Sequence, residues 1–144
     1  MKALIYHKKS FEFKEINTPS LSSNQVLIRV ISTSLNAGDY RLMQINALPK
    51  SGILGSAIAG IVEAIGTDVK HCTIADRVVC DTSSQGLGGL AEFVAVDESL
   101  CVHVPINVSL VDASACPIAS TTALDALRVI KPIKEEDKVL ILGA

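Results

Sequence analysis

Apolar and polar positions alternate along much of the first hundred or so residues, and short clusters of turn residues separate the alternating segments. In segment 25–34, for example, Val26, Ile28 and Val30 fall on the same face of an extended chain. A period of two indicates a strand with one buried face. The segments with a strand pattern are 2–6, 11–16, 25–34, 57–65, 76–80 and 90–96. Their order and mostly nonhelical connections predict a mainly β fold, a partly open barrel with short helices.

One glycine lies inside a predicted strand. Gly60 is in the middle of segment 57–65, and a glycine in a strand interior weakens the strand unless its lack of a side chain serves a local purpose. We therefore expect either a closely approaching partner backbone or a β-bulge at this position. Residues 82–89, which are rich in serine and glycine, are predicted to form a loop between two strands.

The pattern becomes helical after residue 109. Ser109, with Asp112 three positions later, predicts a capped helix start, and Pro117 favours the start or a kink of the next helical run. The apolar residues that share one stripe at helical spacing in that run are Cys116, Ala119, Ala123, Leu127 and Ile130. The stripe predicts an amphipathic helix that ends before Pro132.

The last residues of the chain form an apolar run followed by a glycine. Val139 to Leu142 have the composition of a strand that is covered on both faces, and Gly143 and Ala144 follow at once, as at the opening of a nucleotide-binding βαβ unit. We therefore expect the chain to be the front part of a longer protein. The predicted organisation is a domain over 1–115, a linking helix over 116–137 and the first strand of a further domain over 138–144.

Composition excludes several classes of partner. The formal net charge is -2 and charged residues make up 19% of the chain, so electrostatics do not favour a nucleic-acid or anionic-membrane partner. No apolar run approaches the roughly 20 residues needed to span a bilayer, and we expect a cytoplasmic protein. The four cysteines include no CxxC pair and are expected to be reduced structural thiols.

Several short motifs carry a family resemblance. They include 26–30 followed by 35–39, 54–55 leading into 59–66, 76–79, 88–93 and the Thr-Ala pair at 122–123. In this order, they resemble the N-terminal half of the medium-chain dehydrogenase/reductase family. The resemblance implies a GroES-like first domain followed by a Rossmann cofactor domain.

The resemblance also bears on zinc. Members of this family that use catalytic zinc have a cysteine where this chain has Asn36, and a histidine-glutamate pair where it has Ser56 and Ala57. None of these three side chains is a typical zinc ligand. The chain therefore resembles the zinc-independent quinone or enone reductases. This likeness implies NADPH as cofactor, no zinc, and hydride transfer to a quinone, an enone or another carbonyl substrate.

Site residues follow from the same resemblance. It places Asn36 and Thr122 near the nicotinamide, and Tyr40 as a phenol donor to the substrate oxygen. Gly143 and Ala144 would begin the turn that approaches the cofactor pyrophosphate, and because the rest of that turn is absent, the isolated chain is not expected to bind NADPH. The plainer alternatives are an Asn36–Asp39 turn stabilised by its own side chains, a Tyr40 that only packs, and a Thr122 that bonds within its helix.

Two further expectations remain. One alternative function is a stand-alone GroES-like module that binds or assembles without chemistry. An unpaired apolar strand invites association, so we expect a homodimer or other self-association through residues 117–144. Ala75 stands where the family often has glycine, and an alanine is strained if the backbone there has a positive φ.

Overall fold

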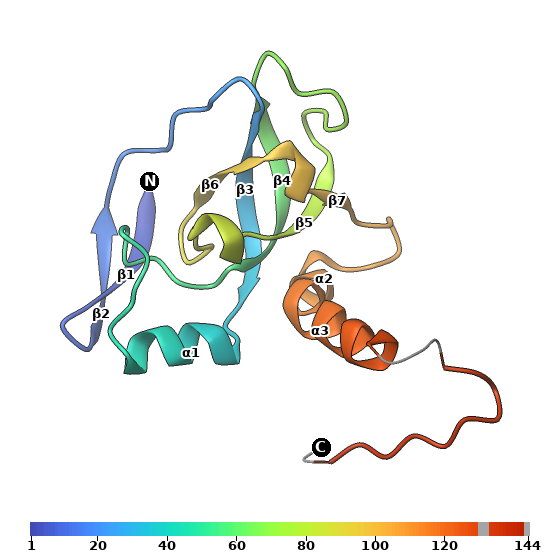
Figure 1. The fold of residues 1–144 in the computed structure, drawn as a ribbon. Coiled ribbons are helices and arrows are strands. Elements are labelled where there is room, and N and C mark those ends of the chain that lie inside the picture. The colour runs from blue at the N-terminus through green and yellow to red at the C-terminus, as the bar shows by residue number, and fades with distance from the viewer. Residues whose placement is uncertain (130–132, 143–144) are drawn as a thin grey trace.

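The larger of two β-sheets forms the body of the molecule. The computed structural model describes residues 1–129 and 133–142, and Figure 1 shows the sheets with short helices beside them. The larger sheet is antiparallel, in the order β6-β3-β4-β5-β7. Its strands are β3 (Gln25–Ser34), β4 (Ala57–Ile65), β5 (Arg77–Asp81), β6 (Phe93–Asp97) and β7 (Val102–His103).

The smaller sheet is the N-terminal hairpin of β1 (Lys2–His7) and β2 (Ser10–Glu15). It joins the rest of the fold through single bridges, from Ala3 to Ala91 and from Ile5 to Ile53. The described strands thus form two sheets that meet at these bridges and do not close into a barrel. The predicted class, mainly β with short helices, is confirmed.

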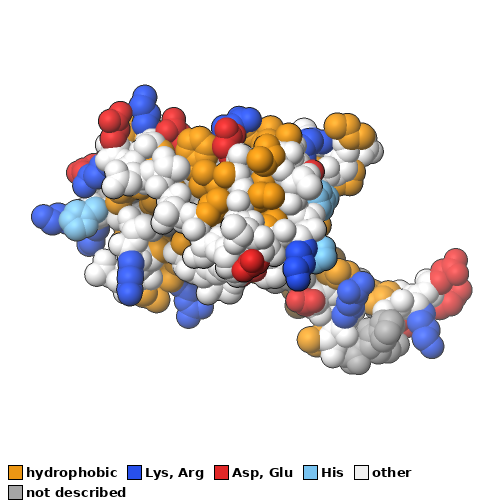
Figure 2. All heavy atoms as spheres, turned by 90° about the horizontal axis from the view of Figure 1, so that it is seen from above, with side chains coloured by type: hydrophobic (Ala, Val, Ile, Leu, Met, Phe, Trp, Pro, Cys, Tyr) orange, Lys and Arg blue, Asp and Glu red, His pale blue; other side chains and the backbone are white. Residues whose placement is uncertain are grey.

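The alternating apolar positions form the core. Val26 and Ile28 on β3 are fully buried, whereas Arg29, which follows them, and the bulge residue Ile31 are exposed. The main buried cluster consists of Val26, Ile28, Ile58, Val62, Cys72, Val78, Cys80, Val94 and Val96. Burial of apolar surface contributes about 25 cal/mol per Å² to folding, so this cluster is a large source of stability for the sheet. On the outside, Figure 2 shows hydrophobic, acidic and basic side chains interspersed on one face of the molecule.

Gly60 meets both expectations for a strand glycine. A Cβ added at Gly60 would lie 2.3 Å from the carbonyl oxygen of Arg29 on β3, far inside van der Waals contact. The pairing of β3 with β4 also shifts register between Val30 and Ser32, which marks a bulge beside Gly60. Only glycine permits the two backbones to approach this closely.

The predicted strand boundaries lie within one residue of the observed ones, except at the start of segment 90–96. The segment predicted over 90–96 becomes β6 only from Phe93, because its first residues bond to the hairpin: Leu4 donates its N–H to the Leu90 carbonyl at 2.7 Å, and the Glu92 N–H donates to the Lys2 carbonyl at 3.0 Å. The strand predicted from Asp76 begins one residue later, because the Asp76 carboxylate accepts the Thr73 N–H at 2.7 Å and belongs to a turn.

The helical elements are short. They are α1 (Ala37–Gln44), η1 (Ser83–Gln85), η2 (Glu98–Leu100), α2 (Leu110–Ser114) and α3 (Cys116–Arg128). The predicted cap of α2 is confirmed, since the Ser109 hydroxyl accepts the Asp112 N–H at 3.0 Å and donates to the Asp112 carboxylate at 2.6 Å. Within the described residues, no helix has both the length and the apolar character that crossing a membrane requires.

The predicted apolar stripe on α3 is not buried. Pro117 and Ile118, at the start of α3, are half-buried, whereas the described residues of the stripe are exposed because none of the described elements covers them. The stripe's last member, Ile130, and Pro132 lie outside the described residues. The described end, 138–142, forms no strand, since a parallel strand needs a neighbouring strand and none is present there.

Candidate functional site

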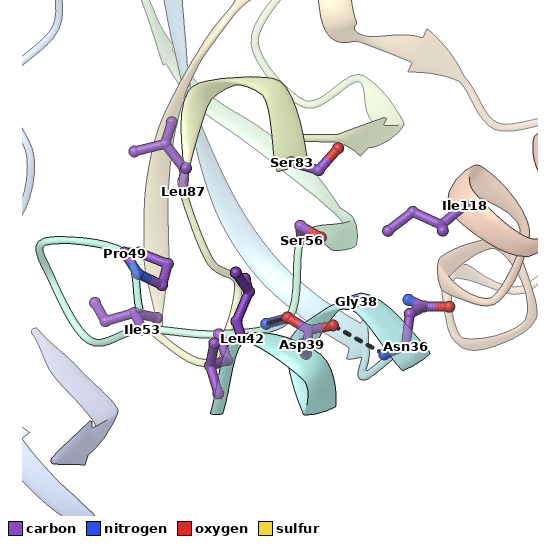
Figure 3. A pocket seen from close by; sticks show the side chains of 13 residues that line it. Asn36, Gly38, Asp39, Leu42, Pro49, Ile53, Ser56, Ser83, Leu87 and Ile118 are labelled. Carbon is purple, nitrogen blue, oxygen red and sulfur yellow. Dashed lines mark hydrogen bonds between the residues drawn. The ribbon is translucent and has the colours of Figure 1, made fainter. Parts of the chain in front are cut away.

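A cavity of about 170 Å³ lies among α1, the loop before β4, the turn around η1 and the start of α3 (Figure 3). Most of its lining is apolar. The apolar side chains are Leu42, Pro49, Ile53, Leu54, Leu87 and Ile118. The polar side chains are those of Asn36, Asp39, Ser56 and Ser83, of which Asp39 alone is charged. An apolar cleft with a few placed polar groups is typical of a small-molecule site.

Asp39 holds two walls of this cavity together. Its side chain is 5% exposed, and Oδ2 accepts the backbone N–H of Asn36 at 2.8 Å, at the start of α1. Its other oxygen, Oδ1, accepts the backbone N–H of Gly55 at 2.9 Å, in the loop before β4. Both carboxylate oxygens are therefore used in structure. Asp39 therefore joins the start of α1 to the loop before β4.

A threonine on β3 fixes the same loop from behind. The Thr33 hydroxyl lies 2.8 Å from the Gly55 carbonyl oxygen and 2.9 Å from that of Ala57. Gly55 has φ +84, and a Cβ there would lie 2.6 Å from Thr33 Oγ1. The loop conformation thus requires glycine twice over, once for the backbone angle and once for space. The backbone position of the next residue, Ser56, is therefore restricted by the fixed conformation of Gly55.

Asn36 lines the cavity with a side chain that is already oriented. Its Nδ2 donates to Ser34, at 3.2 Å to the hydroxyl and 3.4 Å to the carbonyl oxygen. The Asn36 backbone is bonded to Asp39 through the first turn of α1, as in the turn alternative. Both readings of Asn36 are compatible with this geometry, because a residue held by a turn also presents its amide at the cavity wall.

The structure does not bring the other predicted site residues into the cavity. Tyr40 is on α1 but is 61% exposed and is not among the lining residues. Thr122 is on α3, exposed and also outside the lining. Gly143 and Ala144 lie outside the described residues. The roles assigned to these four residues stay predictions.

Two serines complete the polar part of the lining. Ser56 stands directly before β4, and Ser83 opens η1 after β5. From the sequence, Ser56 is predicted only to be a poor zinc ligand, and no role is predicted for Ser83. The only sequence signal for a shared site is that both serines lie close to the ends of predicted strands. Residues at the ends of two strands come together in the fold when those strands are neighbours in the sheet. The pairing of β4 with β5, Ala57 opposite Asp81, was not predictable from the sequence.

The cysteines lie away from this cavity. Cys72 and Cys80 are in the main buried cluster, and Cys101 packs against it. Burial raises the pKa of all three thiols, to about 12 for Cys80, so they remain protonated and poorly nucleophilic. Cys116 is exposed. Among the described residues, no three His, Cys, Asp or Glu side chains gather closely enough to hold a metal ion.

Known proteins share this architecture. Residues 22–106 match the family described as "Alcohol dehydrogenase GroES-like domain". A chloroplastic quinone oxidoreductase of Triphysaria versicolor is 41% identical over 118 residues, which is 78% of this chain and 36% of that protein. A chloroplastic NADPH-dependent alkenal/one oxidoreductase of Arabidopsis thaliana is 32% identical over 122 residues, 78% of this chain and 32% of that protein.

A solved structure agrees with the sequence relatives. The quinone oxidoreductase from Coxiella burnetii superposes with a TM-score of 0.76 at 29% identity, over 88% of this chain and 44% of that chain. This chain spans about a third of the length of the two curated relatives. The family match covers more than half of the residues, and the chain therefore belongs to the alcohol dehydrogenase GroES-like domain family, within the medium-chain dehydrogenases/reductases that include quinone oxidoreductases.

Proposed function

We propose that this chain is the substrate-side domain of an NADPH-dependent oxidoreductase that reduces a quinone, an enone or a related carbonyl compound without zinc. The named activities of the relatives support the reaction class. The cavity is mostly apolar, and its one charged side chain, Asp39, has both oxygens bonded to backbone N–H groups, which supports a compact, uncharged substrate. Because the chain spans about a third of the length of these relatives, the proposed activity requires residues beyond those of this chain.

The observation that carries the zinc-free part is the placement of Asn36 and Ser56. By resemblance, these positions bear zinc ligands in the zinc-dependent members, and both line the same cavity here. An amide and a hydroxyl are poor partners for zinc, which prefers thiolate, imidazole and carboxylate. Ala57, the third position, is buried and has no donor atom. The donor set at this site therefore does not fit a catalytic zinc ion, and we derive no step through one.

The chain's own residues would act mainly by positioning. NADPH, when bound, supplies the hydride. Leu42, Pro49 and Leu87 offer apolar surface to a flat substrate and exclude water from it. Asn36, with its amide fixed by Ser34, would bind the nicotinamide carboxamide or the substrate oxygen. An amide fits a carboxamide because each group both donates and accepts a hydrogen bond.

Other parts of the proposal remain predictions. They are the roles of Tyr40, Thr122, Gly143 and Ala144, the inability of the 144-residue chain alone to bind NADPH, and self-association through residues 117–144. A cytoplasmic location is also a prediction, and the names of both curated relatives place those proteins in chloroplasts.

The test uses the complete gene product that carries these residues, treated with a chelator and assayed for NADPH consumption with quinones and enones. We expect turnover that the chelator does not reduce. Asn36→Ala should lower kcat/KM by about tenfold or more, because it removes a placed hydrogen-bonding group, while Asn107→Ala, at an exposed asparagine outside the cavity lining, should not. Activity that depends on added zinc, or no turnover with either substrate class, would contradict the proposal.

A further inference from the structure

Within residues 1–129 and 133–142, two hydroxyl groups at the cavity wall have no hydrogen-bond partner. The side chains of Ser56 and Ser83 both line the cavity, and in the described part of the chain neither hydroxyl is bonded to another group. The hydroxyls of Thr33 and Thr82 nearby are bonded to backbone carbonyl oxygens. Ser56 and Ser83 thus present two free donors where a ligand would sit.

A backbone bond just beyond the paired ends of β4 and β5 joins the two segments that carry these serines. Thr82, which is fully buried, donates its N–H to the Ser56 carbonyl at 2.8 Å and places its hydroxyl 3.1 Å from the same oxygen. Ser83 follows Thr82 directly, and its N–H donates to the Asp81 carboxylate at 2.9 Å. The backbones that carry both hydroxyls are therefore fixed before a ligand arrives, which is the condition for a useful preorganised donor pair.

The polar hydroxyl and amide groups gather toward one side of the cavity. Figure 3 shows Ser56 and Ser83 on the same side as Asn36, together with the apolar Ile118, whereas Leu42, Pro49, Ile53 and Leu87 lie on the opposite side. A ligand that matches this division has an uncharged hydrogen-bond acceptor at one end and a compact hydrocarbon body at the other. A carbonyl oxygen fits the polar end because its two lone pairs accept two hydrogen bonds.

We propose that the hydroxyls of Ser56 and Ser83 together bind the carbonyl oxygen of the substrate, a compact cyclic or short-chain enone or a quinone, with its hydrocarbon body on the apolar side. This inference rests on the proposed function and assigns the oxygen-binding role to these serines. When the hydride and its electron pair add to the β-carbon of an enone, the π pair of the C=C bond shifts and the oxygen becomes an enolate oxygen. Water then supplies the proton that completes the saturated ketone. Two hydroxyl donors stabilise the developing charge.

A binding experiment tests the pair without requiring turnover. The 144-residue chain is titrated with cyclohexanone, followed by NMR, and the infrared carbonyl stretch of the bound ketone is recorded. A saturated ketone avoids alkylation of the cysteines by an enone. We expect a lower stretching frequency on binding, with Ser56→Ala and Ser83→Ala each weakening the affinity by about fivefold and reversing part of the frequency shift. Ser56→Thr, which keeps a hydroxyl, should restore much of both.

Control measurements distinguish failure of the serine pair from failure of the proposed reductase function. Ser84→Ala, in the same helical turn but outside the cavity lining, should change neither readout. Methylenecyclohexane, which lacks the oxygen, should bind the parent and the serine variants equally. Equal affinity of the doubly substituted Ser56→Ala, Ser83→Ala chain and the parent for cyclohexanone, or an unchanged stretching frequency, overturns the serine pair even if the complete protein proves to be a reductase. Serine-dependent ketone binding supports it even if turnover fails.

Discussion

The buried carboxylate of Asp39 accepts the backbone N–H of Gly55 at 2.9 Å, and this single bond joins the start of α1 to the loop before β4 across the edge of the candidate cavity. The same side chain accepts the N–H of Asn36 at 2.8 Å. An aspartate in a candidate substrate cavity invites a catalytic interpretation. Here both oxygens are occupied by backbone donors, so its role is to set the geometry of the wall.

Asp39→Ala should therefore lower stability. It leaves the N–H groups of Asn36 and Gly55 without their acceptor, at a cost of about 1–3 kcal/mol for each buried group. We expect the free energy of unfolding in urea to fall by about 2–4 kcal/mol. Asp125→Ala, at an exposed aspartate on α3, should change it by less than about 0.5 kcal/mol. Equal effects of the two substitutions would show that the two bonds of Asp39 contribute nothing.

Gly60 and Gly38 provide a matched pair of Gly→Ala substitutions. At Gly60 the new Cβ would meet the Arg29 carbonyl oxygen at 2.3 Å, so the strands must separate, and we expect a loss of at least about 1–3 kcal/mol. At Gly38, in α1, a new Cβ meets nothing within 4 Å, and we expect a gain of about 0.5–1 kcal/mol from the better helix propensity of alanine. Urea unfolding measures both, and a Gly60→Ala protein as stable as its parent would contradict the close packing of β3 on β4.

Ala75 carries the strain that its sequence context predicts. Its φ is +75, in the left-handed region that favours glycine. Ala75→Gly should raise the free energy of unfolding by about 0.5–1 kcal/mol. Relief of the backbone strain stabilises the folded state, and the greater conformational entropy of glycine in the unfolded chain offsets part of that gain. Ala126→Gly, in the exposed α3 helix, should lower it by about 1 kcal/mol. If both substitutions destabilise equally, the positive φ at Ala75 is not present in solution.

Glu98 should make stability depend on acid pH. Desolvation raises the pKa of Glu98, but bonds from the N–H groups of Lys70, His71 and Cys72 outweigh it, so that the pKa lies below its ordinary value of 4.5. A carboxyl whose pKa is lowered by folding contributes stability above its unfolded pKa, and this contribution is lost as the pH falls through the lowered folded-state value.

Glu98→Gln should accordingly be less stable than the parent at neutral pH, and the difference should shrink as the pH falls below 4.5. Chemical unfolding at a series of pH values measures this difference. Glu15→Gln, at an exposed residue of β2, is the control and should change the free energy of unfolding at neutral pH by less than about 0.5 kcal/mol. If the difference in the free energy of unfolding between the Glu98→Gln protein and its parent stays constant with pH, the proposed role of the three N–H bonds is contradicted.

Local patterns predicted the elements whose signals are local. β3 and β4 have the predicted bounds because each is a long segment rich in apolar residues with turn residues beside it, and the cap at Ser109 needs only Asp112 nearby. The start of β6 was missed because Leu90 bonds to β1, some 86 positions away in the chain, and no local pattern contains that contact.

The candidate site was less predictable for the same reason. Asn36 was identified through a family resemblance, but the cavity around it depends on long-range contacts such as that of Asp39 with Gly55 and of Thr82 with Ser56. Those contacts decide that Ser83 faces the cavity and that Tyr40 faces solvent. The side of α1 on which a residue lies cannot be read from eight residues with weak amphipathic character.

The most direct test of the central claim follows the transferred hydrogen. The complete gene product, freed of metal by a chelator, is incubated with an enone and NADPH carrying deuterium at the transferable position of the nicotinamide, and the product is analysed by mass spectrometry and NMR. The account predicts one deuterium on the β-carbon of the saturated ketone. A product without deuterium, or deuterium transfer only after zinc is restored, would contradict a zinc-free hydride transfer at this site.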